Sequence, residues 1–540
     1  MARKAGAGAA GLILMTLCVG QFLMMLDSSV MNVSIATVAQ DVGTNVTGIQ
    51  TAITLYTLVM ASFMITGGKI GQIIGRKRAF AIGCVIYGAG SLTTALAPNL
   101  PVLLIGWSGL EGLGAALILP AIVALVAANF GPAERPRAYG LVTAAAAIAV
   151  AVGPIVGGFF TTYLSWRYVF AGEVLLVIMI LILARRIEAG EPERKVRLDL
   201  VGTGLSALGL GLIVLGVLRS GTWGFVKAKP DAPEWLGLSP VVWLMLGGAA
   251  VLALFFWWEN RLVERKGEPL VNPAILRVSV LKAGLTSFFF QYFLQGGMFF
   301  AMPLFLSIAL GLSAIDTGVR LLPLSFTLIL AAAGIPKLFP DISPRRVVRL
   351  GFLGMFAGLA SMVGALEAGA GAEIVTVPLL LAGLGMGALA SQLGSVTVSS
   401  VPDEQSGEVG GLQNTVTNLG ISVGTALTGA IVIAALSSSF LTGVEENPKV
   451  PASVQARAST ELSGGIPFLS DAELETALDE APGLPPRATD AIVEENEEAR
   501  LVGLRTALAV LALLALVGLF TTGRIPTRQP AAAAEPAGAG

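Results

Sequence analysis

The segment that decides the fold is Gly68-Lys69-Ile70-Gly71-Gln72-Ile73-Ile74-Gly75-Arg76-Lys77-Arg78, a glycine-rich stretch that ends in three cations. It lies between two long apolar segments, so we expect a short basic loop at a membrane surface. A related stretch recurs in the second half of the chain, with Gly334-Ile335-Pro336-Lys337 and Ser343-Pro344-Arg345-Arg346. Short basic loops mark the cytoplasmic side of a membrane protein. The recurrence therefore predicts a duplicated architecture.

The composition places the chain in the membrane class. Of its 540 residues, 54% are hydrophobic and 13% are charged, whereas soluble domains carry roughly 25% charged residues. So little charge could not cover a soluble surface. The chain has no histidine, the side chain that most often transfers protons near neutral pH, so any proton transfer must use carboxylates. Its two cysteines, Cys18 and Cys84, lie in apolar segments and give no disulfide or metal pattern.

Hydropathy predicts an all-α polytopic membrane protein. A helix needs about 20 residues to cross the hydrocarbon core. We expect about fourteen spans, near residues 12–35, 49–70, 79–97, 101–128, 139–163, 168–184, 199–218, 240–258, 281–309, 317–338, 347–366, 374–399, 409–436 and 502–522. An even count places both termini on one side, and the loops of that side carry most of the lysines and arginines. The N- and C-termini are therefore expected to be cytoplasmic, with the protein in the cell membrane.

One long connection, residues 437–500, falls on the external side and is acidic. Within it, Ser470-Asp471-Ala472-Glu473 has the pattern of a capping box and predicts the start of a short helix. We expect the rest to be a solvated external loop, with a lid or a cation-concentrating surface as the alternative. The tail at 524–540, rich in Ala, Pro and Gly, is expected to be disordered.

Several strings resemble the major facilitator superfamily, and in particular its fourteen-helix drug:proton antiporter family. The stretch at 68–78 is similar to the superfamily signature between the second and third helices. Leu26-Asp27-Ser28-Ser29-Val30-Met31-Asn32-Val33 resembles the first-helix motif of this family. Gly153-Pro154-Ile155-Val156-Gly157-Gly158 resembles the string associated with antiporters; glycines also let helices pack closely.

The resemblance implies the major facilitator fold, two six-helix bundles with two extra helices between them. It predicts an N-terminal bundle at 1–184, and a basic linker with the two extra helices at 185–280. The C-terminal bundle is expected at 281–523, before the cytoplasmic tail at 524–540. The antiporter string Gly153, Pro154, Gly157 and Gly158 then belongs to the first bundle.

The chemistry is expected at carboxylates inside the membrane. An ionised carboxylate at mid-membrane costs roughly 2.5–3.5 kcal/mol, so it usually faces a cavity and has a role. Asp27, deep in the first span, is the first candidate for proton or cation coupling: burial favours its protonated form and a cationic substrate favours the ionised form. The alternative is an Asp27 that only hydrogen-bonds to neighbouring hydroxyls.

Glu111, in the fourth span, is the second coupling candidate. The family usually has an arginine and a glutamine where this chain has Ser108 and Glu111, so the family's carboxylate–arginine relay does not carry over. We hypothesise instead that Asp27 and Glu111 form a proton-binding pair. Glu173 in the sixth span stands where the family commonly has Asn; a peripheral, hydrogen-bonded role is the expectation for it.

The sequence gives fewer indications of which residues line the substrate cavity. Aromatic faces and a few amides would suit small lipophilic molecules, including cations attracted to ring faces. The candidate side chains lie in four different spans and are Tyr56, Gln291, Tyr292, Gln295, Gln392, Asn414 and Asn418.

The preferred function is a proton-coupled exporter of lipophilic drugs, antibiotics or related compounds, with the proton gradient as energy source. Export of an endogenous lipid, siderophore or metabolite is the alternative, and a polytopic membrane enzyme or receptor is a third. No catalytic residue, cofactor, metal or nucleic-acid partner is expected, no nucleotide-binding loop is visible, and no oligomer is required.

Gln72 departs from the family, in which this position of the cytoplasmic gate is normally Asp. That Asp is thought to join a charge network that holds the gate closed. The proposed gate residues are Gly68, Gln72, Gly75, Arg76, Lys77 and Arg78. Because Gln72 cannot form an ion pair, we expect a weaker latch and a balance shifted toward inward-facing states.

Overall fold

The computed structural model describes residues 7–130, 135–187, 198–229, 232–367, 371–401, 406–452, 454–455, 468–479 and 485–529. Within these ranges the chain is helical and forms no β-strand. The first half contains α1 (Ala7–Val33), α2 (Ile35–Asp41), α3 (Val46–Ile74), α4 (Arg76–Ala95), α5 (Leu100–Leu103), η1 (Leu104–Glu111), α6 (Gly112–Asn129), α7 (Arg135–Tyr163), α8 (Arg167–Ala184), α9 (Leu200–Trp223) and α10 (Pro240–Glu264).

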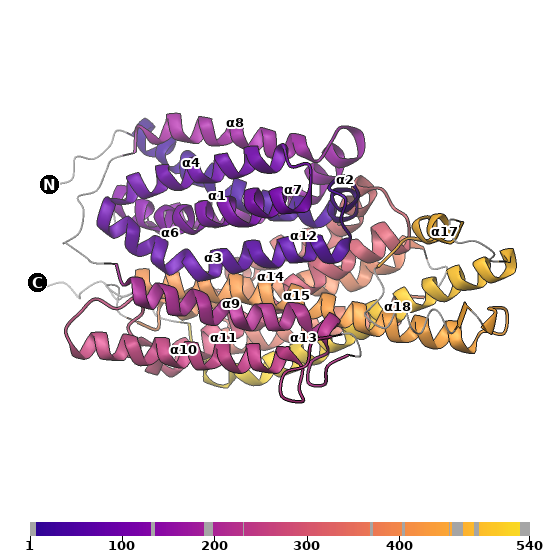
Figure 1. Ribbon diagram of the computed structural model, residues 1–540. Helices are drawn as coiled ribbons and strands as arrows, with labels where there is room; N and C mark the ends of the chain where they lie inside the picture. Colours follow the sequence, from indigo (N-terminus) through magenta and orange to yellow (C-terminus); the bar gives the residue numbers. More distant parts are fainter. Residues whose placement is uncertain are drawn as a thin grey trace, which may run out of the picture.

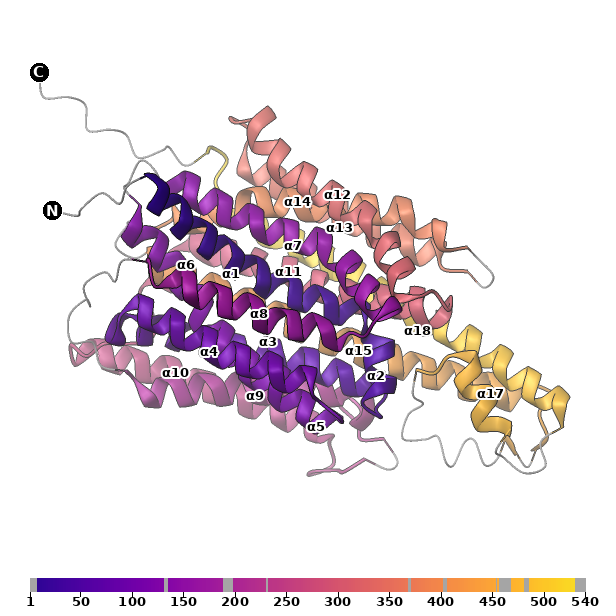
Figure 2. The same cartoon turned by 90° about the horizontal axis from the view of Figure 1, so that it is seen from above.

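The second half repeats the pattern of long helices joined by short connections. It contains η2 (Ile275–Arg277), α11 (Ser279–Pro303), η3 (Leu304–Ala309), α12 (Ala314–Leu338), α13 (Pro344–Ala365), η4 (Ala372–Val375), α14 (Thr376–Val398), α15 (Ser406–Glu446), α17 (Asp471–Asp479), α18 (Pro486–Thr521) and η6 (Thr522–Arg524). In two perpendicular views these long helices run side by side (Figures 1 and 2).

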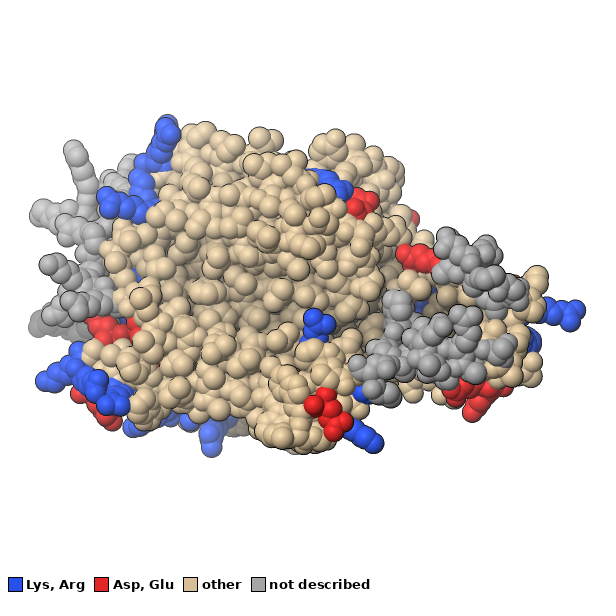
Figure 3. All heavy atoms as spheres, in the orientation of Figure 1, with Lys and Arg blue, Asp and Glu red and all other residues tan. Residues whose placement is uncertain are grey.

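The protein is a multi-pass membrane protein. Thirteen helices of the described ranges are long and apolar enough to cross a membrane. A further helix, α4, has 20 residues and lies among them, but it is less apolar because it carries Gly, Ser and Thr. Figure 3 shows a broad uncharged belt, with most charged side chains toward the two ends of the molecule. This distribution is the one that a bilayer requires, because charges are costly in the hydrocarbon core.

The helices form two groups with a pair between them. Helices α1 and α3 to α8 pack on one another, as do α11 to α15 and α18. Helices α9 and α10 pack against each other, and α9 also contacts α3 and α15, one from each group. The pair therefore lies against the seam between the two groups, in the place expected for the extra helices.

Polar contacts between the two groups gather at the end of the molecule where α2 and α17 lie (Figure 1). Gln50 donates two hydrogen bonds across the seam, to the carbonyls of Thr425 (3.2 Å) and Ala426 (3.1 Å). Ser422 Oγ donates to the Thr54 carbonyl at 3.0 Å. The seam is therefore held closed by direct hydrogen bonds at this end.

The prediction of a loop over 68–78 is wrong in its length: the connection in the structure is much shorter. Helix α3 continues to Ile74 and α4 begins at Arg76, so Gly68 and Gln72 are helical and Gly75 alone makes the connection. The φ of Gly75 is +96°, a conformation that favours glycine. The earlier glycines do not end the helix, since isolated glycines are tolerated inside it. The second copy behaves alike: α12 continues to Leu338 and α13 begins at Pro344.

Four cations at or near these connections, Arg76, Lys77, Arg345 and Arg349, bind within their own group. The Arg76 guanidinium donates to the Ala124 carbonyl of α6 at 3.1 Å. Helix C-termini have unpaired carbonyls that favour cations, and the other cations bind at such ends. Lys77 Nζ donates to the carbonyls of Arg185 (2.9 Å) and Ile187 (2.6 Å), Arg345 Nε to that of Ile525 (2.7 Å), and Arg349 Nε to Thr522 Oγ1 (3.1 Å).

The segment expected as a loop at 437–500 is largely helical where it is described. Helix α15 runs on to Glu446 and α18 already begins at Pro486, so both project beyond the bundle together with α17 (Figure 2). Polar helices that leave the membrane look like loops in a hydropathy profile, which explains the error. Residues 453, 456–467 and 480–484 of this segment lie outside the described ranges, as does 530–540 of the tail.

The predicted capping box is confirmed. The Ser470 N–H and hydroxyl donate to Glu473 Oε2 at 2.8 and 2.7 Å, and the Glu473 N–H donates back to Ser470 Oγ at 3.3 Å. The helix that it opens, α17, is tied to α18 by Arg500, whose side chain is fully buried and bonds both carboxylate oxygens of Asp471 at 2.7 Å.

Candidate functional site

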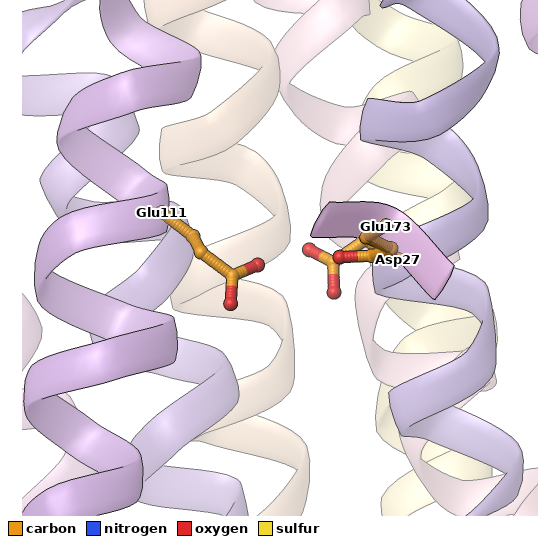
Figure 4. Close-up of side chains that lie close together, drawn as sticks. All are labelled: Asp27, Glu111 and Glu173. Carbon is orange, nitrogen blue, oxygen red and sulfur yellow. The ribbon is translucent and has the colours of Figure 1, made fainter. Parts of the chain in front are cut away.

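Three acidic side chains from three helices meet inside the first bundle. Asp27 comes from α1, Glu111 from the end of η1 and Glu173 from α8, and Figure 4 shows their carboxylates pointing toward one another. One oxygen of each lies within 4.8 Å of the others. All three side chains are buried, with 0–1% of their surface exposed. We call this group the acid cluster.

Asp27 is held by an indole. Trp107 Nε1 donates to Asp27 Oδ1 at 2.9 Å and to Oδ2 at 3.0 Å. The Trp107 ring is stacked on Tyr56, with centroids 4.9 Å apart and planes 7° apart. Trp107 belongs to the π-helical stretch Leu104–Glu111, which also places Glu111. Such stretches are rare and often occur at functional sites.

Glu111 and Glu173 are held by hydroxyls of one helix. Thr94 Oγ1 lies 2.9 Å from Glu111 Oε1. Glu173 Oε2 lies 3.1 Å from Ser91 Oγ and 3.3 Å from Tyr87 Oη. Positions 87, 91 and 94 share one face of α4 by helical periodicity. We call these three residues the hydroxyl stripe.

A close helix approach brings Glu111 to the stripe. A Cβ at Gly90 would lie 2.6 Å from Glu111 Cγ and 2.7 Å from the Glu111 backbone nitrogen. Real Cβ atoms do not come so close, so only glycine fits at this point of α4. The glycine therefore sets the distance between α4 and η1 at the acid cluster.

The acid cluster has no basic partner among the residues that the structure describes. The ion pairs found there join Arg167 to Asp41, Lys449 to Glu494 and Arg500 to Asp471, all away from the cluster. Burial of an ionised carboxylate is costly without a compensating charge or donor, and neighbouring like charges add repulsion. The arrangement therefore suits binding of a small cation, of which the proton is the smallest.

Asp27 and Glu111 were predicted to form a pair, and the structure brings their carboxylates together. Ser108 does not join them; its hydroxyl donates to the Ala52 carbonyl at 2.8 Å. Glu173 has the hydrogen bonds that were expected of it, but the expectation of a peripheral position is wrong for this side chain, which is buried in the cluster. The reason is that α8 packs against both α1 and α4.

Trp107 and the hydroxyl stripe were missed. A tryptophan in an apolar span is usually a packing residue, so the sequence gave no indication that its N–H would bond a carboxylate. The hydroxyl stripe could have been found, because Tyr87, Ser91 and Thr94 recur at helical spacing in a span that is otherwise mostly apolar.

The string at 153–158 lies where α7 meets two other helices. A Cβ at Gly157 would lie 2.9 Å from the Val30 Cα of α1. A Cβ at Gly158 would lie 2.5 Å from the Ile315 Cα of α12, in the second bundle. The string therefore allows close packing both within the first bundle and across the seam.

The predicted cavity residues lie on four helices, α3, α11, α14 and α15. Tyr56 is buried against Trp107, beside the acid cluster. Gln291, Tyr292 and Gln295 lie on α11, which packs against α15. On α15, Asn418 donates to the Asn414 carbonyl at 2.9 Å. On α14, the Gln392 Oε1 accepts from Gln529 near the C-terminal end at 3.0 Å, a contact that occupies this oxygen.

Comparisons with known proteins agree with this architecture. A model of the Major Facilitator Superfamily matches residues 17–425. The chain is 29% identical over 455 residues to a probable actinorhodin transporter of Streptomyces coelicolor, over 82% of this chain and 75% of that protein. It is 30% identical over 421 residues to the cephamycin export protein CmcT of Amycolatopsis lactamdurans, over 76% of this chain and 82% of that protein.

The fold is also that of a solved transporter. A bacterial homolog of the human lysosomal transporter Spinster, in an inward-facing and unoccupied conformation, matches with a TM-score of 0.56 at 14% identity, over 96% of this chain and 98% of that one. With the family model spanning most of the sequence and the expected bundles in place, the chain belongs to the Major Facilitator Superfamily.

Proposed function

We propose that this protein is a secondary active exporter that exchanges external protons for small lipophilic molecules such as drugs or antibiotics. The observation that carries the proposal is the acid cluster, in which Asp27, Glu111 and Glu173 are buried within 4.8 Å of one another without a basic partner in the described ranges. Carboxylates in such a place exchange between protonated and ionised forms as their surroundings change. The proton gradient is then the energy source, and no cofactor is needed.

The class of cargo is proposed from the relatives. The printed names of two of them refer to actinorhodin transport and cephamycin export. The second bundle offers the aromatic pair Phe288 and Tyr292, with ring centroids 6.0 Å apart, on the helix that also carries the amide of Gln291. Ring faces and amides suit lipophilic molecules, including cations.

The coupling follows from competition at the acid cluster. When the cluster faces the external side, protons neutralise it; when it faces the cytoplasm, a cargo with positive charge or a hydrogen-bond donor favours their release. Because protons and cargo favour opposite charge states, each helps to expel the other. The proposal keeps both termini in the cytoplasm, because most lysines and arginines fall in the loops of that side, and keeps the protein in the cell membrane.

The test is uptake into inverted membrane vesicles under an imposed pH gradient. Wild type should accumulate a lipophilic antibiotic only with the gradient, and Asp27→Asn should abolish gradient-driven uptake. Glu373→Gln, the analogous change at an exposed carboxylate, is the matched control and should transport normally. Uptake that needs no gradient, or an active Asp27→Asn variant, contradicts the proposal. Gradient-driven movement of an endogenous lipid, siderophore or metabolite instead would support the alternative cargo.

A further inference from the structure

The hydrogen bonds of the acid cluster distinguish its three acids. A serine or threonine hydroxyl has one hydrogen to donate and can also accept. A backbone carbonyl and an ionised carboxylate can only accept. A hydroxyl that lies between a carbonyl and a carboxylate can therefore satisfy both only if the carboxyl group carries a proton of its own.

Thr94 is in this position. Its Oγ1 lies 2.9 Å from the Gly90 carbonyl oxygen and 2.9 Å from Glu111 Oε1. A bond from a threonine hydroxyl to the carbonyl one turn earlier is common inside helices. When Thr94 gives its hydrogen to Gly90, the second contact becomes a full hydrogen bond only if Glu111 donates. The two distances fit a protonated Glu111 that donates to Thr94 while Thr94 donates to Gly90.

Ser91 repeats the arrangement at the next acid. Its Oγ lies 3.2 Å from the Tyr87 carbonyl oxygen and 3.1 Å from Glu173 Oε2. When Ser91 donates to the carbonyl, Glu173 can donate to Ser91, and the same Oε2 can accept from the Tyr87 hydroxyl at 3.3 Å. All of these contacts are then satisfied with one proton on Glu173.

Asp27 is different because its partner can only donate. The indole N–H of Trp107 lies within 3.0 Å of both Asp27 oxygens, and an indole accepts no hydrogen bond. A donor shared by both oxygens is the arrangement that stabilises an ionised carboxylate.

The remaining oxygens agree with this assignment. Glu111 Oε2 and Glu173 Oε1 are buried without a hydrogen-bond partner, whereas both oxygens of Asp27 are bonded. An unpartnered buried oxygen costs less on a neutral carboxylic acid than on an anion. The other titratable groups that face the cluster are the hydroxyls of Tyr56 on α3 and Tyr87 on α4.

We propose that Glu111 and Glu173 each hold one exchangeable proton in this conformation, while Asp27 is the ionised member of the acid cluster. Glu173 is then a coupling residue in its own right, and the transporter carries two protons rather than one. Asp27, already ionised, is the group that meets a cationic cargo. The assignment of protons stands on the geometry, and their use in transport rests on the proposed function.

Infrared spectroscopy of the full-length protein in lipid membranes at neutral pH tests the assignment, since a protonated carboxylic acid has a carbonyl band apart from that of a carboxylate. The double variant Glu111→Gln/Glu173→Gln defines the part of the band that the two acids contribute. Each single glutamate variant should lose about half of that part. Asp27→Asn and the exposed control Glu373→Gln should lose none of it, and Glu173→Asp, which keeps a carboxyl group, should restore the band.

A band lost in only one glutamate variant, or removed by Asp27→Asn, overturns the assignment. Each variant is first checked for a monodisperse, helical state, and Glu173→Asp separates loss of the proton from loss of folding. The vesicle assay distinguishes this failure from that of the proposed function. The expected band with gradient-independent uptake would overturn proton coupling alone, and gradient-driven uptake without the band would overturn only the proton assignment.

Discussion

Trp107 donates its single N–H to both carboxylate oxygens of Asp27, at 2.9 and 3.0 Å, while its ring is stacked on Tyr56. One aromatic residue therefore positions the acid in α1 and, in the proposed assignment of protons, stabilises its ionised form. Since the indole is part of the same π-helical stretch as Glu111, a movement of that stretch would alter both acids together.

Replacing Trp107 by Phe keeps an aromatic ring beside Tyr56 and removes the donor together with part of the ring system. Hydrogen bonds to charged groups contribute about 1.5–3 kcal/mol, so gradient-driven export should fall about tenfold or more. Because the ionised form of Asp27 loses its donor, Asp27 should take up a proton that it does not hold in the wild type, and export should need a higher cytoplasmic pH to remove it. Vesicle uptake over a series of internal and external pH values measures both effects, with Trp243→Phe, at a partly exposed tryptophan that donates to the Trp235 carbonyl, as control. An unchanged pH profile would contradict the role given to the indole.

Closure of the seam should depend on Gly158. Its hypothetical Cβ would lie 2.5 Å from Ile315 Cα and 2.6 Å from the Ala314 carbonyl of α12. Gly158→Ala must therefore push the two bundles apart where α7 meets α12. We expect more labelling of an introduced cysteine on the outer part of the seam, and slower export. Gly172→Ala on α8 is the matched control, because a Cβ there meets nothing within 4 Å. Equal labelling of both variants would show that the close approach does not matter.

The contact between α17 and α2, in which Gln40 donates to Glu473, should weaken at low pH. Burial raises the pKa of Glu473, but hydrogen bonds from Ser470 and Gln40 and the nearby charge of Arg500 outweigh it, so its pKa lies below the usual value. A carboxylate with a depressed pKa stabilises the folded form above its unfolded pKa, and this contribution is lost as pH falls through its folded pKa.

Backbone hydrogen exchange in α17 should therefore rise when the side of the membrane on which α17 lies is acidified through the range below the ordinary glutamate pKa. Glu473→Gln should show raised exchange already at neutral pH, because it loses the carboxylate that accepts from Ser470 and from Gln40 at 3.2 Å. Glu475→Gln on the exposed face of the same helix is the control. Exchange that is the same in both variants would exclude a stabilising role for the Glu473 charge.

Most of the fold could be predicted because crossing a bilayer requires apolar helices of a fixed minimum length. The errors lie where that requirement ends. Gly68 and Gln72 are helical because the turn needed only Gly75, and the ends of α15 and α18 are helices that leave the membrane and so lose their hydropathy signal.

The site was predictable only in part, for a related reason. A charge in an apolar span stands out in any sequence, which is why Asp27 and Glu111 could be chosen. Their partners depend on packing between helices far apart in the chain, such as the Gly90 contact that brings α4 against Glu111. The role of Trp107 could not be predicted, because the only polar group of a tryptophan side chain is one N–H.

Gln72 carries the last prediction. It lies in the final turn of α3, one turn before the connection at Gly75, where the resembled family places an Asp in a charge network at the cytoplasmic gate. An amide can accept a hydrogen bond but cannot form an ion pair, so the latch of this protein should be weak. Gln72→Asp should reduce labelling of a cysteine introduced in the cytoplasmic half of the seam and increase labelling in the external half. Gln72→Asn, which has the size of Asp without its charge, separates charge from side-chain length. If Asp and Asn give the same labelling, the charge at this position does not govern the balance between inward- and outward-facing states.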